Sequence, residues 1–183
     1  MFQFFTQQKK YLPFVLLSAA FLVMTAILFV GLRKQTQAFY FQDETDHVAV
    51  GWMMNTFGKK LYSDLSTNHQ PLPVLTGAVL AKFISYDTLF VLIERLRIAM
   101  FVYGVLWGAL CVIRFKLHGL FSYALLYSVG YYFFAWHVLA ESIAAPAVLY
   151  IFLLLFEKIF STSKPSLFWQ KFDGIFAGVS LAV

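Results

Sequence analysis

Two adjacent carboxylates, Asp43 and Glu44, have the residue type that acid–base chemistry needs. They stand where an interfacial amphipathic helix is predicted to begin, because apolar residues recur every fourth position after them. These apolar positions are Ala49, Met53 and Phe57, with Val48 and Trp52 beside them, and Gly58 is expected to end the helix. A carboxylate at a helix N-terminus is also a common cap. Asp43 is therefore a candidate general base and a candidate N-cap, and the two roles are compatible.

A polar segment after this helix supplies groups that could bind an anion. Lys59 and Lys60 open the segment, and His69 lies near its end. Both lysines fall on the side of the membrane where basic residues are disfavoured in the topology argued below. An anionic partner such as a lipid phosphate would explain their presence there, and a solvated connection is the alternative.

Charged residues also occur at the edges of two apolar runs. Glu94 and Arg97 lie three positions apart, so an ion pair within one helix is the structural explanation, and phosphate binding by Arg97 is the functional one. His137 and Glu141 lie four apart, and Glu141 is the stronger candidate because its neighbours offer no evident cation. A divalent metal could bind among the histidines and carboxylates, but no spacing matches a metal motif, so no cofactor is required.

The composition indicates a membrane protein. Of 183 residues, 61% are hydrophobic and 13% charged, and 22 are Phe. Soluble domains are about half apolar and a quarter charged. The net charge is +5, but the basic residues form small groups beside the apolar runs, which indicates membrane topology rather than a nucleic-acid partner. The single cysteine, Cys111, excludes a disulfide framework within the chain.

The apolar runs predict an all-α integral membrane protein, a multi-spanning helical bundle within one domain over residues 1–183. The expected spans are 11–32, 89–113, 119–140, 142–157 and, cut short, 174–183. The run Leu72–Ser85 is short enough to be interfacial or re-entrant, so residues 33–86 are expected to form one extracytoplasmic loop that bears the amphipathic helix. The later basic groups then lie inside. If Leu72–Ser85 spans instead, Glu141 faces the cytoplasm. Because the last run stops half-way through a span, the chain is expected to be the N-terminal part of a longer domain.

Short motifs follow the first apolar run in a recognisable order. The order is Asp43-Glu44, Gly58-Lys59-Lys60-Leu61-Tyr62-Ser63-Asp64 and His69-Gln70-Pro71-Leu72, with Glu94-Arg95-Leu96-Arg97 and His137-Val138-Leu139-Ala140-Glu141-Ser142 further on. This order resembles the GT-C glycosyltransferases, the group that contains the protein O-mannosyltransferases and the lipid A aminoarabinose transferases. The motifs are short, so their order carries the resemblance.

The resemblance implies transfer of a sugar, with inversion, from a polyprenyl-phosphate carrier to an acceptor hydroxyl on the extracytoplasmic side. Asp43 would be the general base, and Glu44 would orient the site or bind the acceptor. The residues expected to bind substrate or phosphate are Lys59, Lys60, Tyr62, Asp64, His69, Arg97 and Glu141. Relatives often have Pro-Pro or Lys-Pro where this chain has Gln70-Pro71, which leaves the role of His69 open. The expected location is a bacterial or archaeal plasma membrane, or the endoplasmic reticulum of a eukaryote.

Two other classes of function compete with this one. A transporter or flippase of a lipid-linked substrate would be expected to show internal repeats and broken helices, and no repeat is evident. A non-catalytic membrane subunit would use Asp43 and Glu44 only to cap a helix. The discriminating feature is whether Asp43 and Glu141 face one common outer cavity.

Overall fold

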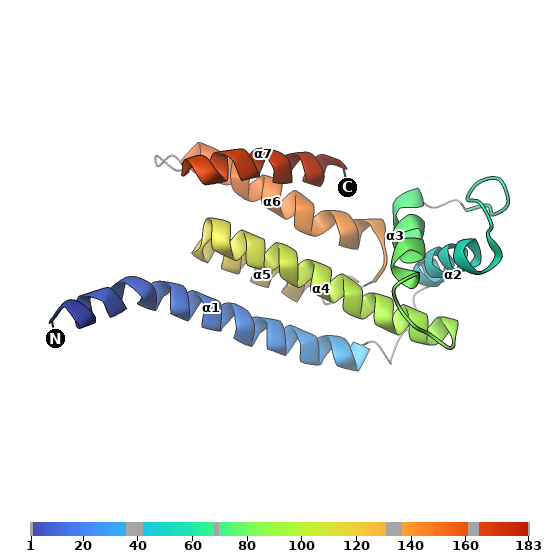
Figure 1. Cartoon of the computed structure of the whole chain (residues 1–183), viewed down its shortest axis with the longest axis horizontal. Helices are drawn as coiled ribbons and strands as arrows, with labels where there is room; N and C mark the ends of the chain where they lie inside the picture. Colours follow the sequence, from blue (N-terminus) through green and yellow to red (C-terminus); the bar gives the residue numbers. More distant parts are fainter. Residues whose placement is uncertain (1, 36–41, 68–69, 131–136, 161–164, 183) are drawn as a thin grey trace.

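The computed structural model describes residues 2–35, 42–67, 70–130, 137–160 and 165–182, and most of them are helical. The helices are α1 (Phe2–Gln35), α2 (Gln42–Phe57), α3 (Pro71–Ala81), α4 (Leu89–Phe115), α5 (Leu117–Gly130), α6 (Ala140–Phe160) and α7 (Leu167–Ala182). In Figure 1, α1, α4, α5, α6 and α7 run along the long axis, and α2 and α3 are gathered at one end. Following the topology expected from the sequence, we name this the outer end, and the opposite end, where α4 turns into α5, the inner end.

Three helices are long and apolar enough to cross a membrane. They are Leu12–Lys34, Leu89–Phe115 and Ala140–Phe160. They overlap the predicted spans 11–32, 89–113 and 142–157, so an all-helical chain with membrane-spanning candidates is confirmed. One predicted boundary differs from the structure, because α7 begins at Leu167, seven residues before the predicted 174. The predicted start follows the charged residues Lys171 and Asp173, because only the apolar run after them was counted. These two residues belong to the helix in the structure. The predicted span 119–140 includes residues 131–136, which lie outside the described residues, and the described residues 137–139 that follow are not helical.

The helix α3 has 11 residues, about half of what a membrane crossing requires. Pro71 occupies its first turn, where the missing N–H of proline costs nothing. In Figure 1, α3 runs across the direction shared by α4 and α6. Length and direction therefore both suit a helix that covers one end of the bundle.

The helix α2 packs closely on α3. Gly51 lies so near the backbone of α3 that an added Cβ would be 2.8 Å from the Ala78 nitrogen. The most buried positions on α2 are Glu44, His47, Val48 and Gly51, which recur at helical spacing. Of the apolar positions noted in the sequence, Val48 is buried, Ala49 and Met53 are half-buried, and Phe57 is exposed. The face of α2 that meets the rest of the protein therefore combines two ionisable side chains with Val48 and Gly51.

The end of α2 follows the expected pattern. Gly58 comes directly after the last helical residue and has a φ of 63°. This left-handed conformation lets the chain leave a helix, and glycine adopts it without a steric penalty. The prediction that Gly58 ends the helix is confirmed.

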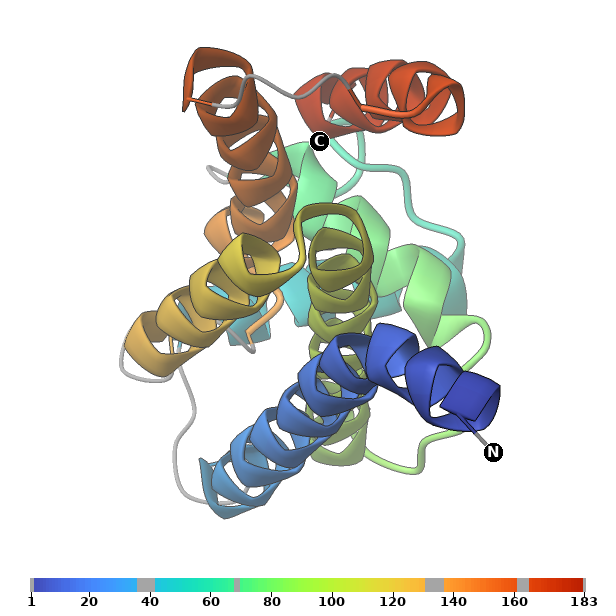
Figure 2. The same cartoon turned by 90° about the vertical axis from the view of Figure 1, so that its left-hand side faces the viewer.

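The helix α4 lies in the middle of the bundle, with α1, α5 and α6 around it in the view along the long axis (Figure 2). Its N-terminus is capped by Thr88, whose hydroxyl accepts a hydrogen bond from the Val91 N–H. At the inner end a single residue, Lys116, joins α4 to α5 with a φ of 56°. The antiparallel pair packs tightly because Tyr123 and Tyr127 of α5 lie against glycines of α4.

Much of the outer surface of these helices is apolar. Leu22 and Ile27 on α1, Leu106 on α4 and Phe121 on α5 are each more than 60% exposed. Large apolar surfaces of this kind are rare on soluble monomers and normal for helices that face lipid. The bundle is therefore suited to a bilayer, with the membrane normal along its long axis.

Candidate functional site

At the outer end, Glu44 forms a buried ion pair with Arg97. The glutamate is 0% exposed and the arginine 2%. The Arg97 guanidinium donates to one Glu44 carboxylate oxygen from Nε at 2.9 Å and from the second terminal nitrogen at 2.5 Å. Glu44 lies in the first turn of α2 and Arg97 lies on α4, so the pair joins residues 53 positions apart. Charge-assisted bonds of this kind are the strong class of hydrogen bond.

The segment just before α6 completes this cluster. The Val138 N–H donates to the other Glu44 carboxylate oxygen at 3.1 Å, and His137 Nε2 lies 3.7 Å from Glu44. Nδ1 of His47, one turn further along α2, is 3.1 Å from the Val138 carbonyl oxygen. We call Glu44, His47, Arg97, His137 and Val138 the Glu44 cluster.

The Glu44 cluster connects three elements: the start of α2, the outer part of α4 and the residues that lead into α6. Glu44 has no exposed surface, and its oxygens are occupied by Arg97 and Val138. A buried and fully bonded carboxylate is placed to hold elements together rather than to meet a substrate. Arg97 is likewise bonded to Glu44, so it is not displayed as an open phosphate ligand. Of the two alternatives for Arg97, an ion pair with Glu94 on the same helix is not the one the structure adopts. Arg97 pairs with Glu44 on α2 instead.

Asp43, the candidate general base, is half-buried. It is the second residue of α2, so the prediction that it is the N-cap is wrong. It still lies in the first turn, where the helix dipole stabilises a negative charge. Because its neighbour Glu44 is fixed to Arg97, the backbone that carries Asp43 is fixed as well.

The loop after α2 carries four of the predicted binding residues. Lys59, Lys60 and Tyr62 are exposed. The loop between α2 and α3 that carries them extends beyond α2 at the edge of the molecule (Figure 1). Asp64 shapes this loop, because its carboxylate accepts a hydrogen bond from the Lys60 N–H at 2.9 Å. His69, also predicted to bind substrate, lies outside the described residues.

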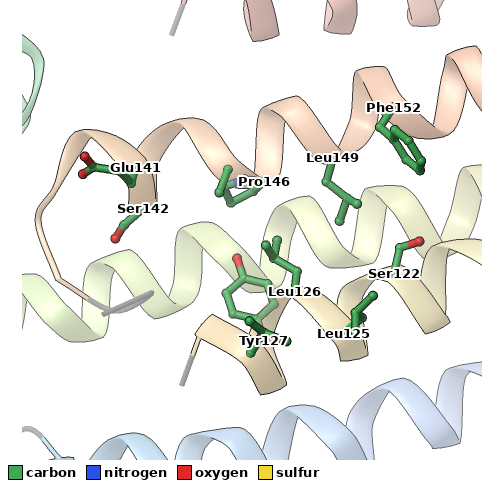
Figure 3. Close-up of a pocket in the computed structure, with 11 residues that line it drawn as sticks. Ser122, Leu125, Leu126, Tyr127, Glu141, Ser142, Pro146, Leu149 and Phe152 are labelled. Carbon is green, nitrogen blue, oxygen red and sulfur yellow. The ribbon is translucent and has the colours of Figure 1, made fainter. Parts of the chain in front are cut away.

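Glu141 is exposed in the first turn of α6 and lines a groove between α5 and α6 (Figure 3). The volume of this outer groove is about 550 Å³, which lies within the usual range of ligand pockets. In Figure 3 Glu141 and Ser142 mark one end of the groove and Phe152 the other. Tyr127 and Ser122 also line the groove, and the rest of its walls is apolar: Leu125, Leu126, Val129, Ala145, Pro146 and Leu149. A carboxylate at one end and mostly hydrocarbon walls match an amphiphilic ligand.

The groove contains Glu141 and does not contain Asp43, Arg97, Lys59 or Lys60. The predicted site residues are therefore divided among the groove, the Glu44 cluster and the outer loop. The link between the first two is short, since Glu44 adjoins Asp43 in sequence and bonds to Val138, three residues before Glu141. As for metals, the described part of the chain brings no three of its His, Cys, Asp or Glu residues together as a ligand set.

A second group of charges, at the inner end, was not predicted. Arg114 of α4 donates to both oxygens of Glu157 on α6, at 3.0 and 2.5 Å, and its Nε donates to Asp173 on α7 at 3.0 Å. The Tyr150 hydroxyl also donates to Asp173, at 2.7 Å. We call these four residues the inner ion cluster. It joins α4, α6 and α7, and charged residues next to apolar runs were the available signal for it.

Comparison with known proteins assigns the chain to no family. No protein family, curated protein or solved structure matches the chain.

Proposed function

We propose that this chain belongs to a membrane glycosyltransferase that moves a sugar from a polyprenyl-phosphate carrier to an acceptor hydroxyl. One observation carries the proposal: a mostly apolar groove between α5 and α6 ends at an exposed carboxylate, Glu141. Hydrocarbon walls suit a polyprenyl chain, and a carboxylate at the mouth suits chemistry on the group that the chain carries. The order of the short motifs, which resembles that of GT-C enzymes, supports the same proposal.

In the proposed reaction the acceptor oxygen attacks the anomeric carbon of the sugar. The bond from that carbon to the carrier phosphate breaks, the phosphate leaves with the bonding electrons, and a carboxylate takes the acceptor proton. Two carboxylates are accessible for that proton, Asp43 in the first turn of α2 and Glu141 at the groove. Glu44 acts through them, because its bonds to Arg97 and Val138 fix the backbone beside each one.

The outer loop supplies positive charge for the anionic carrier. Lys59 and Lys60 are exposed in the loop that follows α2 and do not line the groove. Two flexible lysine side chains can attract a lipid phosphate without a preformed cage. We assign them the role of collecting the substrate at the membrane surface rather than stabilising the leaving group.

The proposal is tested by sugar transfer in membranes that carry the full-length protein, with labelled polyprenyl-phosphate sugars as donors. We expect Asp43→Asn or Glu141→Gln to reduce transfer by about 100-fold or more at unchanged expression, which is the usual contribution of a general base. Asp46→Asn is the matched control, since Asp46 is exposed on the same helix. Transfer that survives both substitutions would remove the carboxylates from the mechanism. If the wild type uses none of the donors, a transporter or a non-catalytic subunit becomes the better explanation.

A further inference from the structure

A second hollow, at the inner end, has a different lining from the outer groove. Its volume is also about 550 Å³, and it is formed where α4, α5 and α6 meet. Three basic residues, Arg114, Lys116 and His118, line it together with Glu157. The rest of the lining is apolar and mostly aromatic: Phe115, Leu153, Phe156 and Phe160. We call it the inner pocket.

The charges of the inner pocket are arranged in two layers. Arg114 is 4% exposed and engages Glu157 and Asp173, so this part of the lining is closed by ion pairs. Lys116 and His118 are exposed. The Lys116 ammonium donates one hydrogen bond, to the Ile113 carbonyl at 2.9 Å, and an ammonium has two further donors. The accessible basic side chains of the pocket are therefore Lys116 and His118, whereas Arg114 is enclosed.

The apolar side of the pocket continues along α6. Phe152, Phe156 and Phe160 are four residues apart, and their ring centroids are separated by 6.5 and 4.7 Å in turn. Phe152 also lines the outer groove, so the aromatic row joins the two hollows. The His118 ring lies 5.9 Å from that of Phe156, which places a polar group beside the row at its inner end. A ligand here meets hydrocarbon over its length and positive charge at one end.

We propose that the inner pocket binds an anionic glycerophospholipid. Its phosphate would lie between Lys116 and His118, and one acyl chain would follow Phe160, Phe156 and Phe152 toward the middle of the membrane. Basic pockets between membrane helices are a recurrent site for anionic headgroups. The inner end also carries the basic groups that the positive-inside rule assigns to the cytoplasmic leaflet, which is where such lipids are enriched. The site is separate from the proposed sugar-transfer chemistry and does not depend on it.

The pocket also lies where a lipid would stabilise the bundle. Its lining includes Arg114 and Glu157, whose ion pair connects α4 to α6, and Asp173 extends the connection to α7. A ligand that binds the folded state and not the unfolded one raises the melting temperature increasingly as its concentration exceeds its dissociation constant. Binding of the lipid is therefore measurable as a shift in thermal unfolding of the protein.

The experiment melts the purified full chain in neutral detergent micelles that contain increasing amounts of phosphatidylglycerol or of phosphatidylcholine, and follows helicity. We expect phosphatidylglycerol to raise the melting temperature at several-fold lower concentration than phosphatidylcholine. Lys116→Gln should raise about fivefold the phosphatidylglycerol concentration that produces a given rise in melting temperature, because one lysine near a lipid surface contributes about that factor to affinity. Lys158→Gln is the matched control, because Lys158 is exposed on α6 next to Glu157 and does not line the pocket.

Equal responses to the two lipids would overturn the proposal, since only the chains would then be recognised. An equal loss in Lys116→Gln and Lys158→Gln would also overturn it, since it would show attraction to surface charge in general. If Lys116→Gln does not fold, because this residue joins two helices at positive φ, His118→Gln tests the same rim without altering the turn.

Discussion

Replacing Glu44 by Gln should lower the free energy of unfolding of this protein by much more than the small change in side-chain size suggests. The Glu44 carboxylate is 0% exposed and Arg97 is 2% exposed, so the substitution leaves a buried guanidinium without its counter-charge. Breaking a buried pair by removal of one partner costs about 3–5 kcal/mol of unfolding free energy. The two Glu44 oxygens accept from different donors, Arg97 and Val138, whereas a glutamine has one acceptor oxygen and turns its NH2 toward the other donor, so we expect a loss in the middle of this range, about 4 kcal/mol.

Substitution of the partner, Arg97→Gln, should cost more, about 5 kcal/mol, because it leaves the fully buried Glu44 carboxylate without the guanidinium that neutralises it. Glu44→Gln combined with Arg97→Gln removes both charges and should be less damaging than the sum of the two losses. We expect a coupling energy of at least about 2 kcal/mol, which lies within the range for residues in direct contact. The measurement is equilibrium unfolding in mixed micelles with increasing dodecyl sulfate, followed by circular dichroism.

Glu94→Gln is the control for this cycle. Glu94 lies on the same helix as Arg97 and three residues from it, and it is half-buried. It takes part in no ion pair within the described ranges, so its substitution should change stability by about 0.5 kcal/mol or less. If Glu94→Gln is as damaging as Glu44→Gln, or if the two losses at Glu44 and Arg97 simply add, the pairing described above is refuted.

Two further predictions concern packing and orientation. Gly119→Ala should destabilise the protein by about 1–3 kcal/mol in the same assay, because the added Cβ would lie 2.1 Å from the Cys111 carbonyl oxygen. Gly178→Ala is the control and should be neutral or slightly stabilising, because the space around Gly178 is open. In a Cys111→Ala background, an impermeant maleimide added to intact cells should label Lys60→Cys and spare Lys116→Cys until the membrane is opened. Labelling of both from the same side would contradict the topology with α2 outside and the α4–α5 turn inside.

The helices were predictable because their signals are local. Apolar runs of membrane length mark α1, α4 and α6, and Gly58 marks the end of α2. The residues that determine a membrane-length helix or a glycine at a helix end all lie within about twenty positions of one another in the sequence. The same reasoning misplaced the start of α7, since Lys171 and Asp173 interrupt the apolar run without interrupting the helix.

The site was less predictable because its contacts are distant in sequence. Arg97 meets Glu44 across 53 residues, and Arg114 meets Asp173 across 59. The local rule offered Glu94 as the partner of Arg97, and the fold replaced it with a residue on another helix. A general signal was present, since a charge inside or beside an apolar run requires a partner, but the sequence does not state which one. The position of Glu141 on a groove likewise depends on how α5 and α6 diverge, which no local pattern encodes.

The Glu44 cluster changes how loss of activity in variants should be interpreted. Glu44 adjoins Asp43 and bonds to the segment that carries Glu141, so its substitution would displace both accessible carboxylates while unfolding the outer end. A catalytic carboxylate behaves differently, because its removal lowers the rate of transfer and leaves the unfolding free energy nearly unchanged. Activity and stability should therefore fall together in Glu44→Gln and separately in Asp43→Asn and Glu141→Gln. If Glu44→Gln retained full stability and lost transfer, the buried carboxylate would have to be opened to substrate during the reaction, and its assignment to positioning would be wrong.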